Sequence, residues 1–232
     1  MLGALGQLVA TAAMLGAMKQ RNFVIGVAYS KTDALQVAIF SSLFLREVPG
    51  WLTLIAIGMA TAGVILLSLP AGGRTTPGLE RGRRAWLSRA GWLGLASGAG
   101  FAVSALGYRG AALQLPGVSP WLIGAWGVLW AQAAQTLVLG GCLAWDSPAS
   151  LRAMAREWRV SLVAGLAGAL ASIGWFTAFA LTSAANVRTL GMVEVVFSYL
   201  VSHRFLKERL AMPEQLGLGL VLLGLVVLCV RL

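Results

Sequence analysis

The chain alternates long apolar segments with short polar connections. Eight apolar segments lie at residues 2–18, 23–45, 51–70, 90–113, 119–145, 160–181, 184–206 and 212–230. Each is close to the roughly 20 residues that a helix needs to cross a bilayer core of about 30 Å. The first segment carries no charge before Lys19 and lacks a basic start and a small-residue cleavage site, so we expect a span there and not a signal peptide. The pattern predicts an all-α membrane protein, a polytopic helical bundle.

Composition supports this class. Hydrophobic residues make up 58% of the chain and charged residues 11%, against about 25% charged residues in a soluble domain. The net charge of +10 does not indicate nucleic-acid binding, because the basic residues lie between the apolar segments. Lys and Arg are concentrated in the connections on the same side as the stretch 71–89, so this side is predicted to be cytoplasmic. We expect an integral, multi-pass protein of the cell membrane, in a bacterium the inner membrane.

Two parts of the sequence, residues 3–70 and 164–231, resemble one another. An offset of 161 residues aligns Ser41 with Ser202, Phe44 with Phe205, Leu45 with Leu206, Arg46 with Lys207, Glu47 with Glu208, Gly58 with Gly219, Gly63 with Gly224, and Asp33 with Glu194. Each copy therefore carries an acidic residue inside an apolar helix. A duplicated helical unit with matched buried acids is typical of secondary transporters.

The duplication predicts three parts. Residues 1–70 form a first repeat without its first two helices, residues 71–89 form an Arg-rich linker, and residues 90–232 form a second repeat of five helices. The repeats are separated by an odd number of spans, so they are predicted to have opposite orientations. We expect two further spans before Met1, in a longer chain or beyond a misassigned start; the alternative is a naturally shortened protein of eight helices.

The corner Ser42-Leu43-Phe44-Leu45-Arg46-Glu47 precedes an apolar helix with Gly58 and Gly63, and a second corner, Arg204-Phe205-Leu206-Lys207-Glu208, precedes another. These motifs resemble the drug/metabolite transporter superfamily, specifically the EamA-type permeases. The resemblance implies ten helices in two inverted halves around a central cavity, no cofactor, and transport of small organic solutes, often outward. It also implies a cytoplasmic C-terminus, whereas the charge distribution places this end outside, so the absolute orientation stays open.

Four of the charged residues inside apolar segments are candidates for the bilayer interior: Lys31, Asp33, Arg188 and Glu194. A charge at the bilayer centre costs about 2.5–3.5 kcal/mol on insertion scales, so each must face the bundle interior, pair, or reach the interface. Asp33 and Glu194 each lie about 15 Å from a predicted helix start and so near mid-membrane. We expect these two acids to bind a solute ammonium group or exchange protons. Arg188 lies only about 6 Å along the helix from its predicted start near Ala184. Its side chain is therefore predicted either to line the site or to snorkel to the interface.

Further polar residues share helical faces with these charges. Tyr29 and Gln36 lie on the face of Asp33, and Ser198 lies on the face of Glu194. Lys31 is expected to pair with Glu194, or with Asp33 through a kink. Additional lining is predicted from Gln132, Gln135, Ser172 and Trp175. The alternative for all of these polar groups is that they only join helices by hydrogen bonds.

The remaining candidates point to structure. Glu47 is expected to cap a helix or form an interfacial ion pair, and Tyr108-Arg109 to anchor a helix at the interface. The chain has one His, two isolated Cys and no phosphate-binding loop, so neither an enzyme, a metal centre nor an ATP-driven pump is predicted. We expect a secondary transporter, an exporter of a small solute, with possible proton coupling and a possible homodimer. The alternatives are a non-transporting scaffold or assembly partner and an inactive truncated permease.

Overall fold

The protein is helical throughout the part of the chain that the structure describes. The computed structural model describes residues 1–19, 32–67, 89–197 and 212–230, and these contain no strand. Three helices there are long and apolar enough to cross a membrane: α6 (Arg89–Leu113), α7 (Pro120–Asp146) and α9 (Trp158–Leu181). The predicted class, an all-α membrane protein, is confirmed.

The other elements are shorter. They are α1 (Leu2–Met18), α3 (Asp33–Phe40), the π-helix η1 (Ser41–Leu45), α4 (Trp51–Leu67), α8 (Pro148–Arg156), α10 (Ala184–Gly191) and α12 (Met212–Cys229). Each of the eight predicted apolar segments corresponds to at least one helix of the structure. Two features were not predicted: helix α8 between α7 and α9, which has no buried residue, and the interruption of the segment 184–206 after Gly191.

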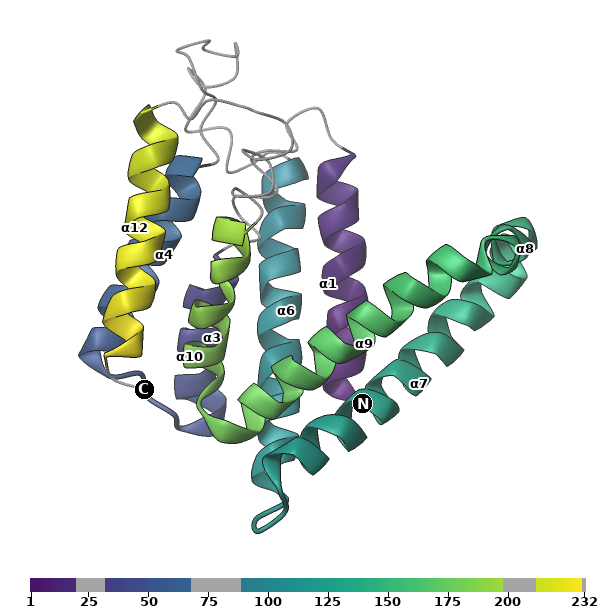
Figure 1. Cartoon of the computed structure of the whole chain (residues 1–232), viewed down its shortest axis with the longest axis horizontal. Coiled ribbons are helices and arrows are strands. Elements are labelled where there is room, and N and C mark those ends of the chain that lie inside the picture. The colour runs from purple at the N-terminus through teal and green to yellow at the C-terminus, as the bar shows by residue number, and fades with distance from the viewer. Residues whose placement is uncertain (20–31, 68–88, 198–211, 231–232) are drawn as a thin grey trace.

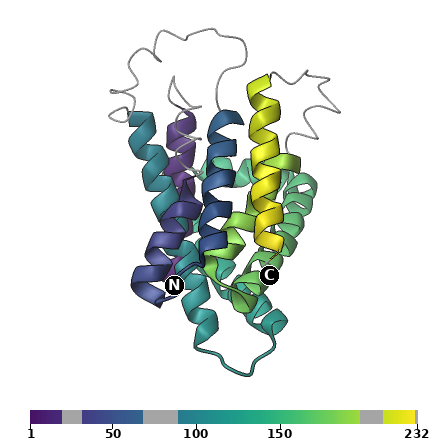
Figure 2. The ribbon, with the colours of Figure 1, turned by 90° about the vertical axis from the view of Figure 1, so that its left-hand side faces the viewer.

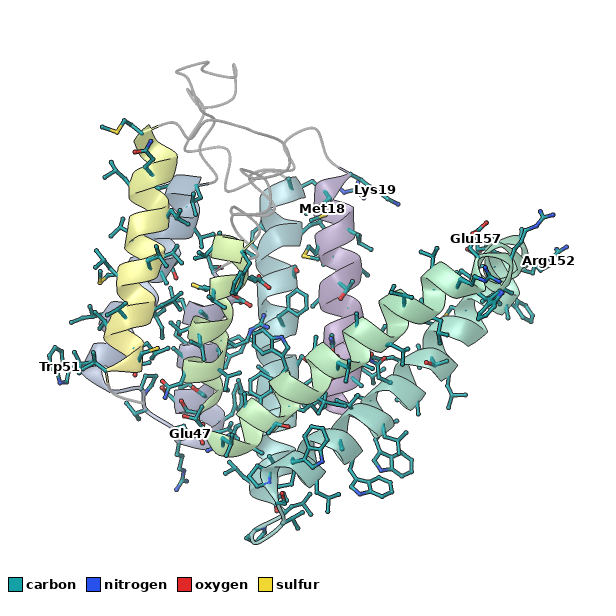
Figure 3. All side chains as sticks on the ribbon, viewed as in Figure 1. Met18, Lys19, Glu47, Trp51, Arg152 and Glu157 are labelled. Carbon is teal, nitrogen blue, oxygen red and sulfur yellow. The ribbon has the colours of Figure 1, made fainter. Side chains whose placement is uncertain are left out.

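Figure 1 shows two parts of the bundle. Helices α1, α3, α4, α6, α10 and α12 run roughly upright, while α7 and α9 slant away together and carry α8 at their far end. Figure 2, a view turned by 90°, shows the same upright group side by side. In Figure 3, Lys19 lies at the opposite end of the bundle from Glu47 and Trp51. This is expected if α1 and the α3–η1 segment cross the membrane in succession.

Helices α4 and α12 pack through small residues. A methyl group added at Gly63 would lie 2.5 Å from the carbonyl oxygen of Gly217 and 2.7 Å from the side chain of Val221. One added at Gly224 would lie 2.9 Å from the carbonyl oxygen of Ala56. Small residues at such spacing let helix backbones approach closely in a membrane, where packing drives association.

These contacts are reciprocal under the 161-residue offset. Gly63 is aligned with Gly224, and Gly217 with Ala56, so the contact of Gly63 with Gly217 corresponds to the contact of Gly224 with Ala56. Two elements related by a twofold axis contact one another in this way. The boundaries of the repeats themselves stay a prediction.

The α3–η1 segment ends in a fixed corner. Arg46 has a left-handed backbone, with φ of 56°, and the backbone N–H of Glu47 donates to the carbonyl oxygen of Ser41 at 3.2 Å. The Ser42 hydroxyl donates to the Ala38 carbonyl oxygen at 2.8 Å. A left-handed residue with such a bond is a common way to end a helix. The corner therefore sets the direction in which Glu47 leaves the helix.

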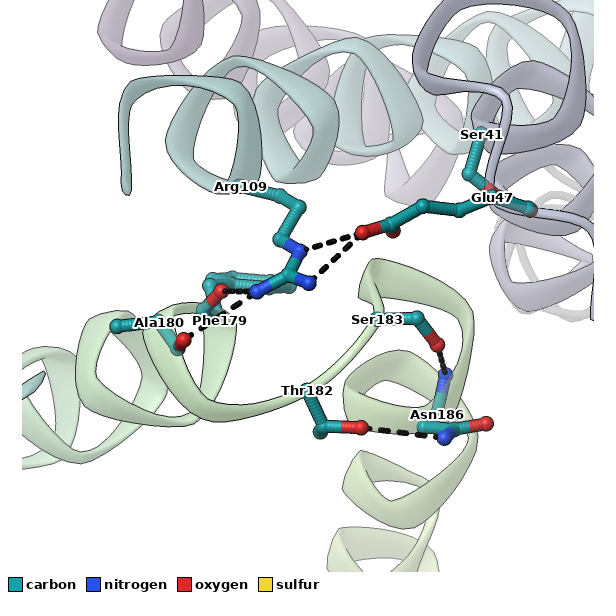
Figure 4. Close-up of polar contacts among 8 residues, drawn as sticks. All are labelled: Ser41, Glu47, Arg109, Phe179, Ala180, Thr182, Ser183 and Asn186. Atoms are coloured by element: carbon teal, nitrogen blue, oxygen red, sulfur yellow. Dashed lines mark hydrogen bonds and ion pairs between the residues drawn. The ribbon is translucent and has the colours of Figure 1, made fainter. Parts of the chain in front are cut away.

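Glu47 binds Arg109 of α6 (Figure 4). The Arg109 guanidinium donates to the Glu47 carboxylate at 2.8 Å, and to the carbonyl oxygens of Phe179 at 2.9 Å and Ala180 at 3.3 Å. Arg109 thus satisfies carbonyl groups at the end of α9 that have no partner within the helix. The ion pair expected of Glu47 is present, but its partner comes from α6, so Arg109 joins three elements and does not serve as a separate interface anchor.

The turn that follows α9 starts α10. The Asn186 side chain donates to the Thr182 hydroxyl at 3.2 Å, and the Asn186 backbone N–H donates to the Ser183 hydroxyl at 3.4 Å (Figure 4). Ser183 is the N-cap of α10, a position where serine is favoured. This cap fixes the first turn of the helix that carries Arg188.

The close contact of α4 with α12 predicts a sharp difference between two glycines of α4. Gly63→Ala should lower the melting temperature of the purified protein by several degrees, because overpacking costs about 1–3 kcal/mol. Gly58→Ala is the matched control, since a methyl group there would meet nothing within 4 Å. It should be neutral or stabilising, because Ala favours helix over Gly by up to about 1 kcal/mol. Equal effects of the two substitutions in a thermal unfolding assay would contradict this packing.

The Arg109–Glu47 pair predicts energetic coupling. Both side chains are largely buried, at 13% and 20% exposed. Arg109→Gln should destabilise more than Glu47→Gln, because it also leaves the Phe179 and Ala180 carbonyls without a donor. A double-mutant cycle on unfolding free energies in mild detergent should give a coupling of about 1 kcal/mol or more. Additive effects would show that the pair contributes nothing beyond its separate groups.

Candidate functional site: an arginine-lined pocket

A cavity of about 100 Å³ lies where α1, α6, α9 and α10 meet. It is smaller than typical small-molecule sites, which have about 300–1,000 Å³, so a bound solute requires the surrounding helices to move apart. The lining combines aromatic rings with a few polar groups and one charge: Gln7, Phe101, Ser104, Ala105, Tyr108, Ser172, Trp175, Phe176, Phe179 and Arg188. The chemistry of this lining is suited to a small molecule with an apolar body.

The charge belongs to an ion pair that joins α10 to α3. The Arg188 guanidinium donates to the Asp33 carboxylate, and the two side chains are only 18% and 12% exposed. Asp33 begins α3 and Arg188 lies in the last turn of α10. Pairing offsets the large cost of holding single charges in an apolar interior. The interfacial alternative considered for Arg188 is therefore not the arrangement found.

Two aromatic rings flank the guanidinium. The Arg188 guanidinium carbon lies 5.3 Å from the centre of the Phe101 ring and 5.4 Å from the centre of the Trp175 ring. A cation over an aromatic face is attracted by the ring quadrupole. Trp175 is itself fixed in place by Gly191, because any side chain at this position would overlap the indole ring. Arg188 is thus held by one carboxylate and two rings.

Arg188 retains hydrogen-bonding capacity. A guanidinium has five N–H donors, and Asp33 accepts from one nitrogen. The Nε atom of Arg188 is buried and has no hydrogen-bond partner among the described residues. A buried donor without a partner costs free energy and is rare in proteins. Arg188 lines the pocket, but its Nε atom is buried, so this donor can bind a solute only if the guanidinium moves.

The opposite wall is a small polar network. Gln7 of α1 accepts hydrogen bonds from the Tyr108 hydroxyl at 2.9 Å and from the Gln135 side-chain amide at 3.1 Å. Gln135 also donates to the carbonyl oxygen of Ala4 at 3.2 Å. The Tyr108 ring stacks on Phe176, with 3.9 Å between ring centres. Helices α1, α6, α7 and α9 are therefore linked around the pocket.

The predicted site residues separate into groups. Asp33, Arg188 and Trp175 come together at the pocket, and Gln135 lies one hydrogen bond away through Gln7. Other predicted residues lie elsewhere: Gln36 donates to the Thr32 hydroxyl of its own segment at 3.0 Å, and Gln132 is exposed. Tyr29, Lys31 and Ser198 lie outside the described residues.

The two matched acids, Asp33 and Glu194, do not lie in the same site. Glu194 is exposed and does not belong to the pocket lining, whereas Asp33 pairs with Arg188. The backbone explains the position of Glu194. The N–H of Met192 donates to the carbonyl oxygen of Thr189, so α10 is interrupted before Glu194. Residues 193–197 form a separate helical turn.

Three of the pocket residues were predicted as lining, namely Ser172, Trp175 and Arg188. The other seven were not predicted: Gln7, Phe101, Ser104, Ala105, Tyr108, Phe176 and Phe179. Two signals for them are present in the sequence. Phe101, Ser104, Ala105 and Tyr108 have the spacing of one helical face, and Gln7 is a polar residue within an apolar segment.

Comparison with known proteins agrees with this architecture. Residues 89–230, more than half of the chain, match the sequence profile of the EamA-like transporter family. The matched region contains α6, Trp175 and Arg188, and therefore most of the pocket wall. No curated protein gives a significant match. On the strength of the profile match and the helical membrane fold, the chain belongs to the EamA-like transporter family.

Proposed function

We propose that this protein is a secondary transporter that exports a small organic solute across the cell membrane, in a bacterium the inner membrane, and that the Arg188 pocket is its solute site. The observation that carries the proposal is the buried pair of Asp33 and Arg188 at the wall of an aromatic pocket. Ionisable residues inside a membrane bundle are costly and commonly mark the pathway of a solute or ion.

The position of the pocket supports the proposal. Helices α1 and α3 belong to the predicted first repeat, and α6, α9 and α10 to the predicted second. Transporters built from inverted repeats bind their solutes at the repeat interface, and the repeats move against each other around this site. We therefore propose alternating access, with the reciprocal contact of α4 and α12 as the place where the two halves stay joined.

The Arg109 contacts are connected to the pocket through Phe179. Phe179 lines the pocket and accepts a hydrogen bond from Arg109, which also binds Glu47. Opening toward Phe179 requires α6, α9 and the α3–η1 corner to separate. The transport cycle would therefore include breaking or moving this ion pair.

A scaffold is the second candidate, because the Asp33–Arg188 pair could serve only to fix α3 against α10. The aromatic pocket and the buried Nε of Arg188 favour the transporter, since a pair that only fixed two helices would need neither. The possible proton coupling proposed for Asp33 and Glu194 applies only to a transporter.

The proposal predicts loss of transport when the pair is neutralised. In proteoliposomes containing the full chain and loaded with a panel of radiolabelled small organic acids, amines and neutral solutes, wild type should move at least one solute faster than empty liposomes do. Asp33→Asn and Arg188→Gln should each lower this flux at least tenfold, because each removes a charge needed in the cycle.

Gln132→Ala is the matched control, since Gln132 is a polar residue of α7 that is exposed and outside the pocket lining. It should transport like wild type. Thermal unfolding and gel filtration of each variant report whether the protein is intact. Full transport by both charge variants, or no flux above empty liposomes for any solute with intact wild type, would reject the proposal in favour of the scaffold.

A further inference from the structure

We infer that the solute of the Arg188 pocket is an organic anion, with a carboxylate on a flat apolar body. The solute carboxylate replaces Asp33 as the hydrogen-bond acceptor of Arg188, and the Asp33 carboxylate takes up a proton from water. This inference rests on the proposed function, because it assigns a solute class to the same pocket. It differs from the expectation that acidic residues bind a solute ammonium group.

The charged group in the pocket lining favours an anionic solute over a cationic one. Arg188 is the charged residue among those that line it, and the other lining residues are uncharged. The faces of Phe101 and Trp175, which would otherwise attract a solute ammonium group, already face the guanidinium. A cation bound here would lie against a like charge in a low-dielectric site, where repulsion is strong.

The shape of the donor group favours a carboxylate. A guanidinium presents its N–H groups in a planar fork that matches the two oxygens of a carboxylate. The buried Nε of Arg188, which has no partner among the described residues, is part of this fork. The rings of Tyr108, Phe176 and Phe179 then offer apolar faces to the body of the solute.

Charge balance requires a proton. Arg188 and Asp33 together have no net charge, so an added carboxylate would leave one unbalanced negative charge in an apolar site. If Asp33 is protonated as the solute binds Arg188, the site is neutral both empty and loaded. The proton comes from water and ends on a carboxylate oxygen of Asp33, and the released guanidinium donors pass to the solute carboxylate.

In the part of the chain that the structure describes, the elements packed against Asp33 contain no second carboxylate that could take up this proton. The elements packed against α3 are α4, α6, α10 and η1, and α4 and η1 contain no titratable residue. Lys31 lies outside the described residues, and Glu194, beyond α10, is exposed and does not line the pocket. The titratable residues of α6 and α10 are Arg89, Tyr108, Arg109 and Arg188. The Tyr108 hydroxyl binds Gln7, and Arg109 binds Glu47.

The solute class is tested with three probes of similar shape and different charge: benzoate, benzamide and benzylammonium. Binding to the full chain in lipid nanodiscs is followed by tryptophan fluorescence and isothermal titration. Benzoate should bind saturably and at least tenfold more tightly than benzamide, and benzylammonium should bind most weakly. Arg188→Gln should lose at least tenfold in benzoate affinity, and Arg188→Lys, which keeps the charge without the fork, should lie between. Gln132→Ala should bind like wild type.

The proton is tested by linkage. With a pH indicator in weakly buffered solution, wild type should take up about one proton per benzoate bound, so benzoate affinity should fall about tenfold per pH unit as pH rises. Asp33→Asn removes both the competitor for Arg188 and the proton acceptor. It should bind benzoate at least as tightly as wild type at neutral pH, without proton uptake and with little dependence on pH.

The double variant Asp33→Asn/Arg188→Gln separates loss of binding from loss of folding. It replaces the ion pair with two neutral amides that can still hydrogen-bond to each other. It should be as stable as wild type and should not bind benzoate. Benzamide or benzylammonium binding as tightly as benzoate would overturn the anion assignment, and transport of a neutral or cationic solute would leave the proposed function standing. Benzoate binding without proton uptake, benzoate binding unchanged in Arg188→Gln, or no binding of any probe would also overturn the inference.

Discussion

The attraction between Asp33 and Arg188 is the constraint on which the candidate site depends. The two residues are 155 positions apart in the sequence, and neither would be stable alone in an apolar bundle. Their pairing requires the start of α3 to lie against α10, and it holds the guanidinium between Phe101 of α6 and Trp175 of α9. Four helices are thus positioned around one charge, and the pocket is the space that remains beside it.

The contact between α4 and α12 is symmetric, whereas the Asp33–Arg188 pair is not. At the 161-residue offset, the contact of Gly63 with Gly217 corresponds to the contact of Gly224 with Ala56. The same offset aligns Arg188 with Val27 in the sequence, so the arginine of the charged pair has no basic counterpart. Close backbone packing needs only small residues in both copies, whereas a solute needs a particular charge at a particular place. The small residues of α4 and α12 therefore provide the packing, and a single arginine without a counterpart at the 161-residue offset gives the pocket its charge.

Hydropathy predicted the positions of the apolar helices. Polar residues in these helices pointed to three residues that the structure brings together, namely Asp33, Arg188 and Trp175. The partner of Asp33 could not be predicted, because pairing across the bundle depends on how helices rotate and where they break. The interruption of α10 at Met192 leaves Glu194 on a separate turn, and nothing in local composition indicates it. Tyr108 and Arg109 were misplaced for a related reason. A Tyr-Arg pair near the end of an apolar segment is typical of interface anchors, and only the packing of α6 on α9 and η1 shows that both side chains bind inside the bundle.

The corner at residues 42–47, one of the two motifs that resemble the transporter family, is also connected to the pocket. Arg46 ends the π-helix in a left-handed conformation and so directs Glu47 to Arg109, which in turn holds the carbonyl oxygen of Phe179. Phe179 contributes its ring to the pocket wall. A movement of the corner is therefore transmitted to the pocket through one arginine and one backbone carbonyl group. It follows that the corner cannot shift relative to α6 and α9 without loosening the pocket, which is the coupling that a site opening at one end at a time requires.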